Sequence, residues 1–136
     1  HRAGLLICRD IWHMDTVLAC AEKGAELIFA PSAVPMRSIS RKGPAISAFI
    51  ERTVQGYAEK NHLFFAYANR VGFEEGICFY GGSLIADPFG SILTKSPFIE
   101  EQLLFIEISW ESIERKNKVL PLSYEQQSYS AWSKEV

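Results

Sequence analysis

The 136-residue sequence predicts an α/β fold in which a βαβαβ unit precedes a meander of strands and a late helix. Apolar residues at 2–8 and 26–30 predict strands, and the helical pattern between them makes a strand–helix–strand unit with parallel strands. The segments 5–7 and 63–67 are apolar throughout, as in strands buried on both faces. Because so short a chain has little to cover both faces, we expect one face to meet a second sheet that this chain supplies only in part.

The first half of the chain is predicted from apolar spacing and from residues that stop regular structure. Residues 2–8 predict a buried strand, and residues 13–23 predict a helix that Gly24 ends. Residues 26–30 predict a second short strand, which we expect Pro31 to end. These three elements form the first βαβ unit.

A loop, a helix and a third strand follow. Residues 31–44 contain three prolines together with Ser, Arg, Lys and Gly, and they predict the loop. Residues 45–61 predict the longest helix, and residues 63–68 predict the third strand. The apolar stripe of that helix consists of Ile46, Phe49, Ile50, Val54, Tyr57 and Ala58.

The second half predicts shorter strands. Residues 71–76 are glycine-rich and partly acidic, and they predict a loop. Residues 84–86 and 91–94 predict a hairpin whose turn, 87–90, has the sequence Asp-Pro-Phe-Gly. Residues 102–108 predict one further strand.

The chain closes with a predicted short amphipathic helix over residues 110–119 and a polar tail over residues 121–136. The tail carries Tyr124, Tyr129 and Trp132, aromatic side chains suited to docking on a partner surface.

Composition excludes several classes of protein. Apolar residues make up 48% and charged residues 22%, and with a net charge of −2 and no basic patch we expect no nucleic-acid partner. No apolar run approaches the roughly 20 residues that span a bilayer, and no signal peptide opens the chain, so we expect no membrane association. Three widely spaced cysteines predict neither zinc ligands nor a disulfide framework. We therefore expect a cytoplasmic protein without metal or cofactor.

Cys8 is the candidate nucleophile. It ends the apolar run 3–7 and is followed directly by the polar residues Arg9 and Asp10, so the thiol is held rigidly where the chain turns. Cys20 lies within the helical pattern, where a small apolar side chain simply packs. A free cysteine is more often an inert core residue than a nucleophile, which is the competing interpretation of Cys8.

A cysteine nucleophile needs a base nearby. Asp10 fits better as a cap of the following turn, His13 as a helix-start or pocket-wall residue, and His62 as a surface residue past a helix. The backbone N–H of Arg9 is a natural donor to an oxyanion. A Cys–His protease would require His13 or His62 within hydrogen-bond distance of the Cys8 sulfur.

Several other residues are candidates for the walls of a pocket. Trp12, Phe79 and Tyr80 are aromatic candidates that would fit a core equally well. Glu74 lies in the glycine-flanked loop and either lines a cleft or is solvated. Asn69, at the end of a strand, either binds substrate or pins the loop, and we favour pinning.

Several ordered blocks of this sequence together resemble the nitrilase (carbon–nitrogen hydrolase) superfamily. The blocks are 4–10 (GLLICRD), 24–28 (GAELI), 30–33 (APSA), 68–72 (ANRVG), 79–83 (FYGGS) and 85–90 (IADPFG). They extend over residues 3 to about 108, and several blocks in the right order are specific where one alone would be weak.

The resemblance implies a partial αββα nitrilase-like sandwich and a Cys–Glu–Lys catalytic set. Cys8 would attack an amide carbonyl or a nitrile carbon, and a glutamate would be the general base and acid. A lysine and the backbone amide of Arg9 would hold the oxyanion. The product would be a thioester acyl-enzyme that water hydrolyses.

The sequence departs from the family pattern at the start of the chain. In the family the glutamate and the lysine precede the cysteine, whereas the seven residues before Cys8 include neither. The chain begins at His1 rather than Met, which we interpret as a piece of something longer. Residues 1–120 are therefore expected to be the C-terminal half of a carbon–nitrogen hydrolase domain, with 121–136 as its tail. We expect the isolated chain to be inactive.

Asp10, two residues after the cysteine, resembles family members that act on amides or carbamoyl groups, so we predict a small-molecule amide substrate. The alternative is a non-catalytic nitrilase-like binding or assembly module. A half-domain would expose a sheet face and unpaired edges, so we expect a homo-oligomer or association with the missing N-terminal half.

Overall fold

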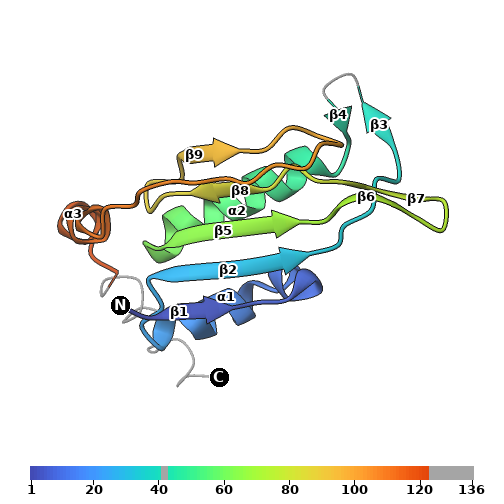
Figure 1. Ribbon diagram of the computed structural model, residues 1–136. Coiled ribbons are helices and arrows are strands. Elements are labelled where there is room, and N and C mark those ends of the chain that lie inside the picture. Colours follow the sequence, from blue (N-terminus) through green and yellow to red (C-terminus); the bar gives the residue numbers. More distant parts are fainter. Residues whose placement is uncertain (41–42, 123–136) are drawn as a thin grey trace, which may run out of the picture.

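The computed structural model describes residues 1–40 and 43–122, in which five strands form one sheet (Figure 1). In spatial order the strands are β1 (Ala3–Leu5), β2 (Leu27–Ser32), β5 (Phe64–Asn69), β8 (Leu84–Ala86) and β9 (Ile92–Lys95). β1, β2 and β5 are parallel, and β8 and β9 add antiparallel to them. The predicted α/β class, with βαβαβ before the meander, is confirmed.

Helices α1 (Met14–Glu22) and α2 (Ser47–Asn61) provide the two crossovers between the parallel strands. Each buries one face, α1 through Val17 and α2 through three members of the predicted stripe, Ile50, Val54 and Ala58. Phe49, also predicted for that stripe, is instead 42% exposed. Gly24 follows α1 with a φ of 81°, the left-handed conformation that commonly ends a helix. Both helices lie behind the sheet in Figure 1, so the core forms on that one face.

Strand alternation sends neighbouring residues of β2 to opposite faces of the sheet. Ile28 is fully buried against the helices, where it pairs in register with Phe65 of β5. Phe29 points to the other face and is 46% exposed, and its β1 neighbour Leu5 is 65% exposed. Among the described residues, this face is therefore only partly covered.

One end of this open face is covered by the last helix, α3 (Glu111–Val119), and the residue before it. Trp110 packs edge-on against Phe64, with ring centroids 5.8 Å apart, and stacks on His1 at 4.2 Å. This contact explains why Phe64 is buried although it shares a face with exposed Phe29.

A β-hairpin replaces the loop predicted over residues 71–76. It consists of β6 (Val71–Glu74) and β7 (Ile77–Tyr80), joined by Glu75 and Gly76. Both joining residues have positive φ, 48° and 80°, as a tight two-residue hairpin turn requires. The glycine-rich sequence thus supplied a turn, and the flanking residues paired as strands.

The strand predicted over residues 102–108 is a second difference. This segment pairs with no strand among the described residues, and Leu103 and Phe105 are 75% and 83% exposed. Apolar composition favours a strand, but a strand forms only where a neighbour supplies hydrogen bonds.

β2 also continues past Pro31 to Ser32, where the prediction ended it. The pairing of β1 with β2 stops at Phe29, so the side of β2 that faces β1 is a free edge at Pro31. Proline has no backbone N–H, but at this free edge no strand is present to accept a hydrogen bond from it.

Two smaller features complete the described fold. β3 (Ile39–Ser40) and β4 (Gly43–Pro44) form a short antiparallel pair within the predicted loop. None of the described helices is both long and apolar enough to cross a membrane. The predicted tail with Tyr124, Tyr129 and Trp132 lies outside the described residues.

The two faces of β2 give a direct stability test. Ile28→Ala is expected to lower the free energy of unfolding by about 3 kcal/mol because it opens a cavity in the core. Phe29→Ala, one residue away on the open face, is expected to lower it by less than about 1 kcal/mol. Urea unfolding at low protein concentration measures both, and equal losses would contradict the assignment of the covered face.

Candidate active site

Cys8 lies in a tight turn where β1 gives way to a 3-10 helix, Cys8–Trp12. The Asp10 carboxylate accepts a hydrogen bond from the Ile7 N–H at 2.8 Å, and the Asp10 N–H donates to the Ile7 carbonyl at 3.0 Å. Cys8, between them, has a φ of 48°, a left-handed conformation that non-glycine residues adopt only under constraint. Asp10 therefore holds the turn that contains Cys8.

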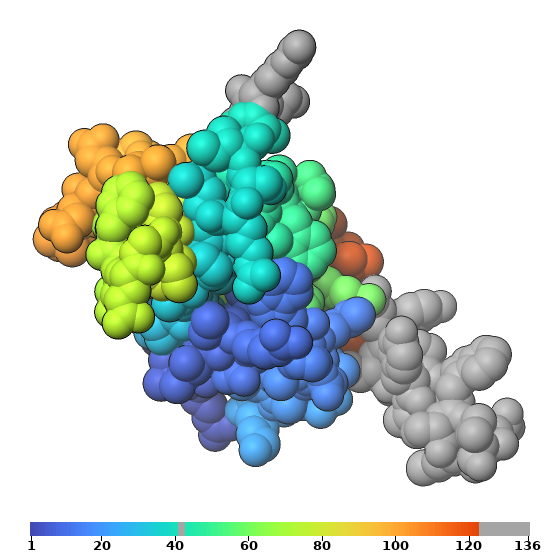
Figure 2. Space-filling view, turned by 90° about the vertical axis from the view of Figure 1, so that its right-hand side faces the viewer, coloured from blue at the N-terminus to red at the C-terminus, as the bar shows by residue number. Residues whose placement is uncertain are grey.

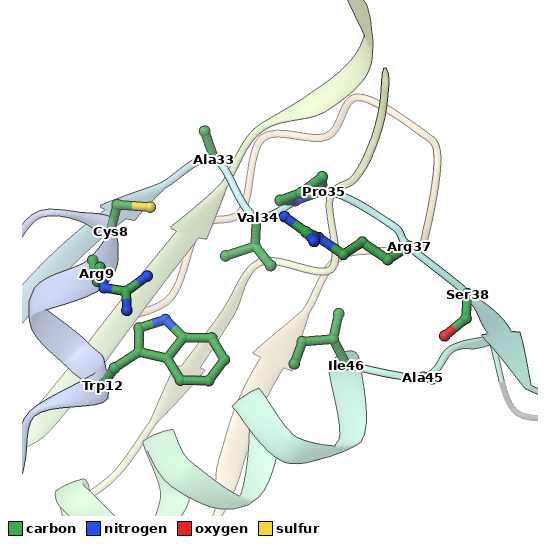
Figure 3. A pocket seen from close by; sticks show the side chains of 10 residues that line it. All are labelled: Cys8, Arg9, Trp12, Ala33, Val34, Pro35, Arg37, Ser38, Ala45 and Ile46. Atoms are coloured by element: carbon green, nitrogen blue, oxygen red, sulfur yellow. The ribbon is translucent and has the colours of Figure 1, made fainter. Parts of the chain in front are cut away.

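The Cys8 thiol is half-buried and faces a cavity of about 620 Å³. Three segments form its walls: residues 8–12 after β1, residues 33–38 after β2, and residues 45–46 at the entrance to α2. Figure 2 looks onto this side of the molecule, and Figure 3 shows the side chains around the space. The cavity thus lies at the carboxyl ends of parallel strands, where α/β sheets commonly bind ligands.

Asn69, at the end of β5, holds the wall formed by residues 33–38. Its side-chain oxygen accepts a hydrogen bond from the Val34 N–H at 2.8 Å, and its amide nitrogen donates to the Gly81 carbonyl at 2.9 Å. Because Asn69 is buried, these bonds tie two loops to the sheet. The preference for pinning over substrate contact matches this geometry.

The hairpin of β6 and β7 holds the same wall further along. The Met36 N–H donates to the Cys78 carbonyl at 2.7 Å, and Pro35 pairs with Phe79 in an isolated β-bridge. Arg37 follows directly on this anchored stretch and lines the cavity. The predicted pocket residue Phe79 thus supports the wall from behind.

Two phenol groups, those of Tyr67 and Tyr80, are buried, and Tyr67 lies near Cys8. Neither the Tyr67 nor the Tyr80 hydroxyl finds a hydrogen-bond partner among the described residues. Burial raises the pKa of Tyr67 above its ordinary value of 10.0, and nearby Tyr80 and Cys8 act in the same direction. Burial also raises the pKa of Tyr80, so both phenols are neutral donors at physiological pH.

The structure gathers some of the predicted site residues and separates others. Cys8, Arg9 and Trp12 line the cavity, whereas Asp10, His13, Asn69, Glu74, Phe79 and Tyr80 do not. Glu74 instead pairs with Arg70 at 2.6 Å on the exposed hairpin, and this hydrogen bond lowers the pKa of the Glu74 carboxyl. His13 is the residue that precedes α1.

Neither histidine considered as a base is joined to Cys8. The prediction that His62 is a surface residue is wrong: it is buried at the end of α2, where its Nδ1 lies 2.6 Å from the Asn117 side-chain oxygen. No hydrogen bond links His13 to the Cys8 thiol within the described ranges, so the geometry gives no support to a Cys–His protease. Residues 1–40 and 43–122 also contain no grouping of three or more His, Cys, Asp or Glu side chains placed to hold a metal ion.

Sequence reasoning missed Arg37 as a wall residue and Tyr67 as a neighbour of Cys8. Arg37 follows the second parallel strand by five residues, so the rule that ligands lie at carboxyl ends of strands was the available signal. Tyr67 lies within an apolar strand and gave no such signal.

Comparison with known proteins gives a consistent result. Residues 1–118 match the family model described as carbon-nitrogen hydrolase. The chain is 32% identical over 130 residues to a glutamine-dependent NAD(+) synthetase of Aquifex aeolicus, covering 95% of this chain and 22% of the relative. It is 38% identical to an (R)-stereoselective amidase of Pseudomonas sp (70% and 32%) and 29% identical to an N-carbamoylputrescine amidase of Arabidopsis thaliana (86% and 42%).

Solved structures agree in fold. A carbon-nitrogen hydrolase from Helicobacter pylori superposes with a TM-score of 0.81 at 28% identity, over 90% of this chain and 45% of that one. A mutant of the amidase from Nesterenkonia sp. AN1, with the acetamide moiety of fluoroacetamide added covalently at the active-site cysteine, superposes with 0.60 at 32% identity (70% and 33%). The chain spans less than half the length of each of these proteins.

Removing the Asn69 side chain tests the support of the cavity wall. Asn69→Ala is expected to lower the free energy of unfolding by about 3 kcal/mol, because it leaves the buried Val34 N–H and Gly81 carbonyl without partners. Amide hydrogen exchange at Val34 should accelerate along with this loss. Arg52→Ala, at an exposed position of α2, is the control and should change neither. Unchanged exchange at Val34 in the Asn69 variant would contradict the proposed support.

The raised phenol pKa values predict instability in alkali. Tyr57, Tyr67 and Tyr80 all have pKa values raised from 10.0, chiefly by burial, so the folded state holds these protons more tightly than the unfolded state does. The stability that they contribute is complete below pH 10 and is lost as the pH rises from there towards their folded pKa values. Urea unfolding as a function of pH should show this fall, and Tyr67→Phe should reduce it. A flat profile above pH 10 would contradict the prediction.

Proposed function

Because the chain belongs to the carbon–nitrogen hydrolase family, we propose that it carries the nucleophile-bearing half of an amidase and that Cys8 is the nucleophile. The observation that carries the proposal is the placement of the Cys8 thiol: a constrained turn presents it to a cavity at the carboxyl edge of the sheet. Strained backbone is typical of functional residues that the surrounding structure holds in place.

In the first chemical step the Cys8 thiolate attacks the amide carbonyl carbon and forms a C–S bond. The negative charge moves to the carbonyl oxygen. The backbone N–H of Arg9 is suited to bind this oxygen, because the first N–H groups of a helix have no hydrogen-bond acceptor within the helix. The tetrahedral intermediate then expels the nitrogen as the C–N bond breaks. A general acid supplies the proton that the leaving ammonia or amine needs.

In the second step water attacks the thioester carbon and a general base accepts its proton. The C–S bond breaks, the carboxylic acid leaves, and the thiolate returns. This sequence conserves atoms and electrons, and it consumes only the amide and water.

The described cavity wall supplies the nucleophile and an oxyanion donor but no acid–base group. No Asp, Glu or Lys lines it among the described residues. In the family resemblance these roles belong to a glutamate and a lysine, so we propose that both come from outside this chain and that the isolated chain does not turn over. The same absence favours one alternative, a non-catalytic nitrilase-like binding or assembly module.

The proposed substrate class is an amide or carbamoyl amide, supported by the amidase and carbamoyl-amidase relatives. Asp10 does not select between these two classes by contacting the substrate, because its carboxylate is engaged in capping the turn. For the open face of the sheet, which carries Leu5 and Phe29, we propose a covering partner, either the other half of the fold or a second copy of the chain.

A chimera tests the proposed chemistry. Residues 1–118 replace the matched part of the Helicobacter pylori carbon-nitrogen hydrolase, which supplies the remaining half of the fold. We expect ammonia release from simple amides and an added acyl mass on the Cys8 peptide, whereas the isolated chain should release none.

Two variants of the chimera serve as matched controls. Cys8→Ala should abolish both signals, and Cys20→Ala should retain them, because Cys20 lies on α1 rather than at the cavity. Ammonia release that survives Cys8→Ala would refute the assigned nucleophile. A chimera that melts cooperatively yet releases no ammonia would favour the non-catalytic module.

A further inference from the structure

The cavity beside Cys8 contains two arginines that face each other. Figure 3 shows the guanidinium group of Arg9 extending from the 3-10 helix and that of Arg37 reaching back from the opposite wall. Neither group makes a hydrogen bond or an ion pair among residues 1–40 and 43–122. Arg2 and Arg70, by contrast, donate to the Lys23 carbonyl and to the Glu74 carboxylate.

The two positive charges have no counter-charge on the described cavity wall. No Asp or Glu lines the cavity, and the carboxylate nearest in sequence, that of Asp10, accepts the hydrogen bond from Ile7. The α2 entrance, with Ala45 and Ile46, adds partial positive charge because it is the amino end of a helix. The wall therefore favours an anion.

The remaining wall is mostly apolar. The Trp12 indole lines the cavity and is held by stacking on Phe49, with ring centroids 5.2 Å apart, while Val34 and Ile46 line another part. A volume of about 620 Å³ is large for a simple amide and suits a ligand with a reactive end, an alkyl middle and a charged end.

We propose that the substrate is an amide with a carboxylate at the end remote from the scissile C–N bond, such as the monoamide of a dicarboxylic acid, and that Arg9 and Arg37 bind this carboxylate. The inference rests on the proposed function, since it takes Cys8 as the attacking group. A guanidinium suits the role because its planar array of donors matches the two oxygens of a carboxylate. The alkyl portion lies against Trp12.

A pair of thiol reagents tests the anion preference on the 136-residue chain itself, without catalysis. Iodoacetate and iodoacetamide form the same C–S bond and expel the same iodide, and they differ in the negative charge. We expect the rate ratio of iodoacetate to iodoacetamide, measured by peptide mass spectrometry, to be about fivefold higher at Cys8 than at Cys78. Added salt should reduce that difference.

Charge-removing variants locate the effect. The double substitution Arg9→Gln and Arg37→Gln should bring the ratio at Cys8 down to that at Cys78. Arg115→Gln on α3, far from the cavity, is the matched control and should leave it unchanged. Equal ratios at the two cysteines in the parent chain, or a ratio at Cys8 that the double variant does not lower, would overturn the proposal.

The chimera separates this inference from the proposed function. Faster hydrolysis of succinamate than of butyramide, lost in the double variant, would support the carboxylate site. Equal hydrolysis of the two amides would leave Cys8 as the nucleophile and refute the carboxylate site.

Discussion

The constraint on which the candidate site depends is the turn at the end of β1. Asp10 and Ile7 exchange two hydrogen bonds, and the residue next to Ile7 is thereby held in the left-handed region. An unconstrained cysteine favours negative φ, so the turn holds the Cys8 backbone in a conformation that it would not otherwise adopt. The 3-10 helix begins at this turn, so the turn also positions the Cys8 thiol, the first backbone N–H groups of the helix and Trp12.

The opposite wall depends on a different tie. Residues 33–38 have almost no regular structure, yet Asn69 and the β6–β7 hairpin fasten them to the sheet through buried or backbone hydrogen bonds. This arrangement places Arg37 across from Arg9, 28 positions earlier in the chain. The pocket is therefore assembled by long-range bonds, and its charge is a property of the assembled fold.

The open sheet face and the partial set of proposed catalytic groups have the same proposed explanation. The described chain covers one side of its sheet with α1 and α2 and leaves Leu5 and Phe29 exposed on the other. Its cavity likewise has the proposed nucleophile, Cys8, on one wall, and no Asp, Glu or Lys among the described residues that line it. Under the proposed function, one partner would both cover the open face and supply the acid–base groups.

The sequence by itself determined the βαβαβ order and most of the buried helix positions, because apolar spacing and turn residues act over a few positions, and it made Cys8 the candidate nucleophile. It did not determine the 71–80 hairpin or the unpaired segment 102–108, since pairing depends on which strand lies alongside. It predicted that Asp10 caps the turn, but it did not show that Glu74 pairs with Arg70 or that Tyr67 and Arg37 lie near Cys8. Those relations join residues that are distant along the chain or that compete for the same partner, so only the tertiary structure decided them.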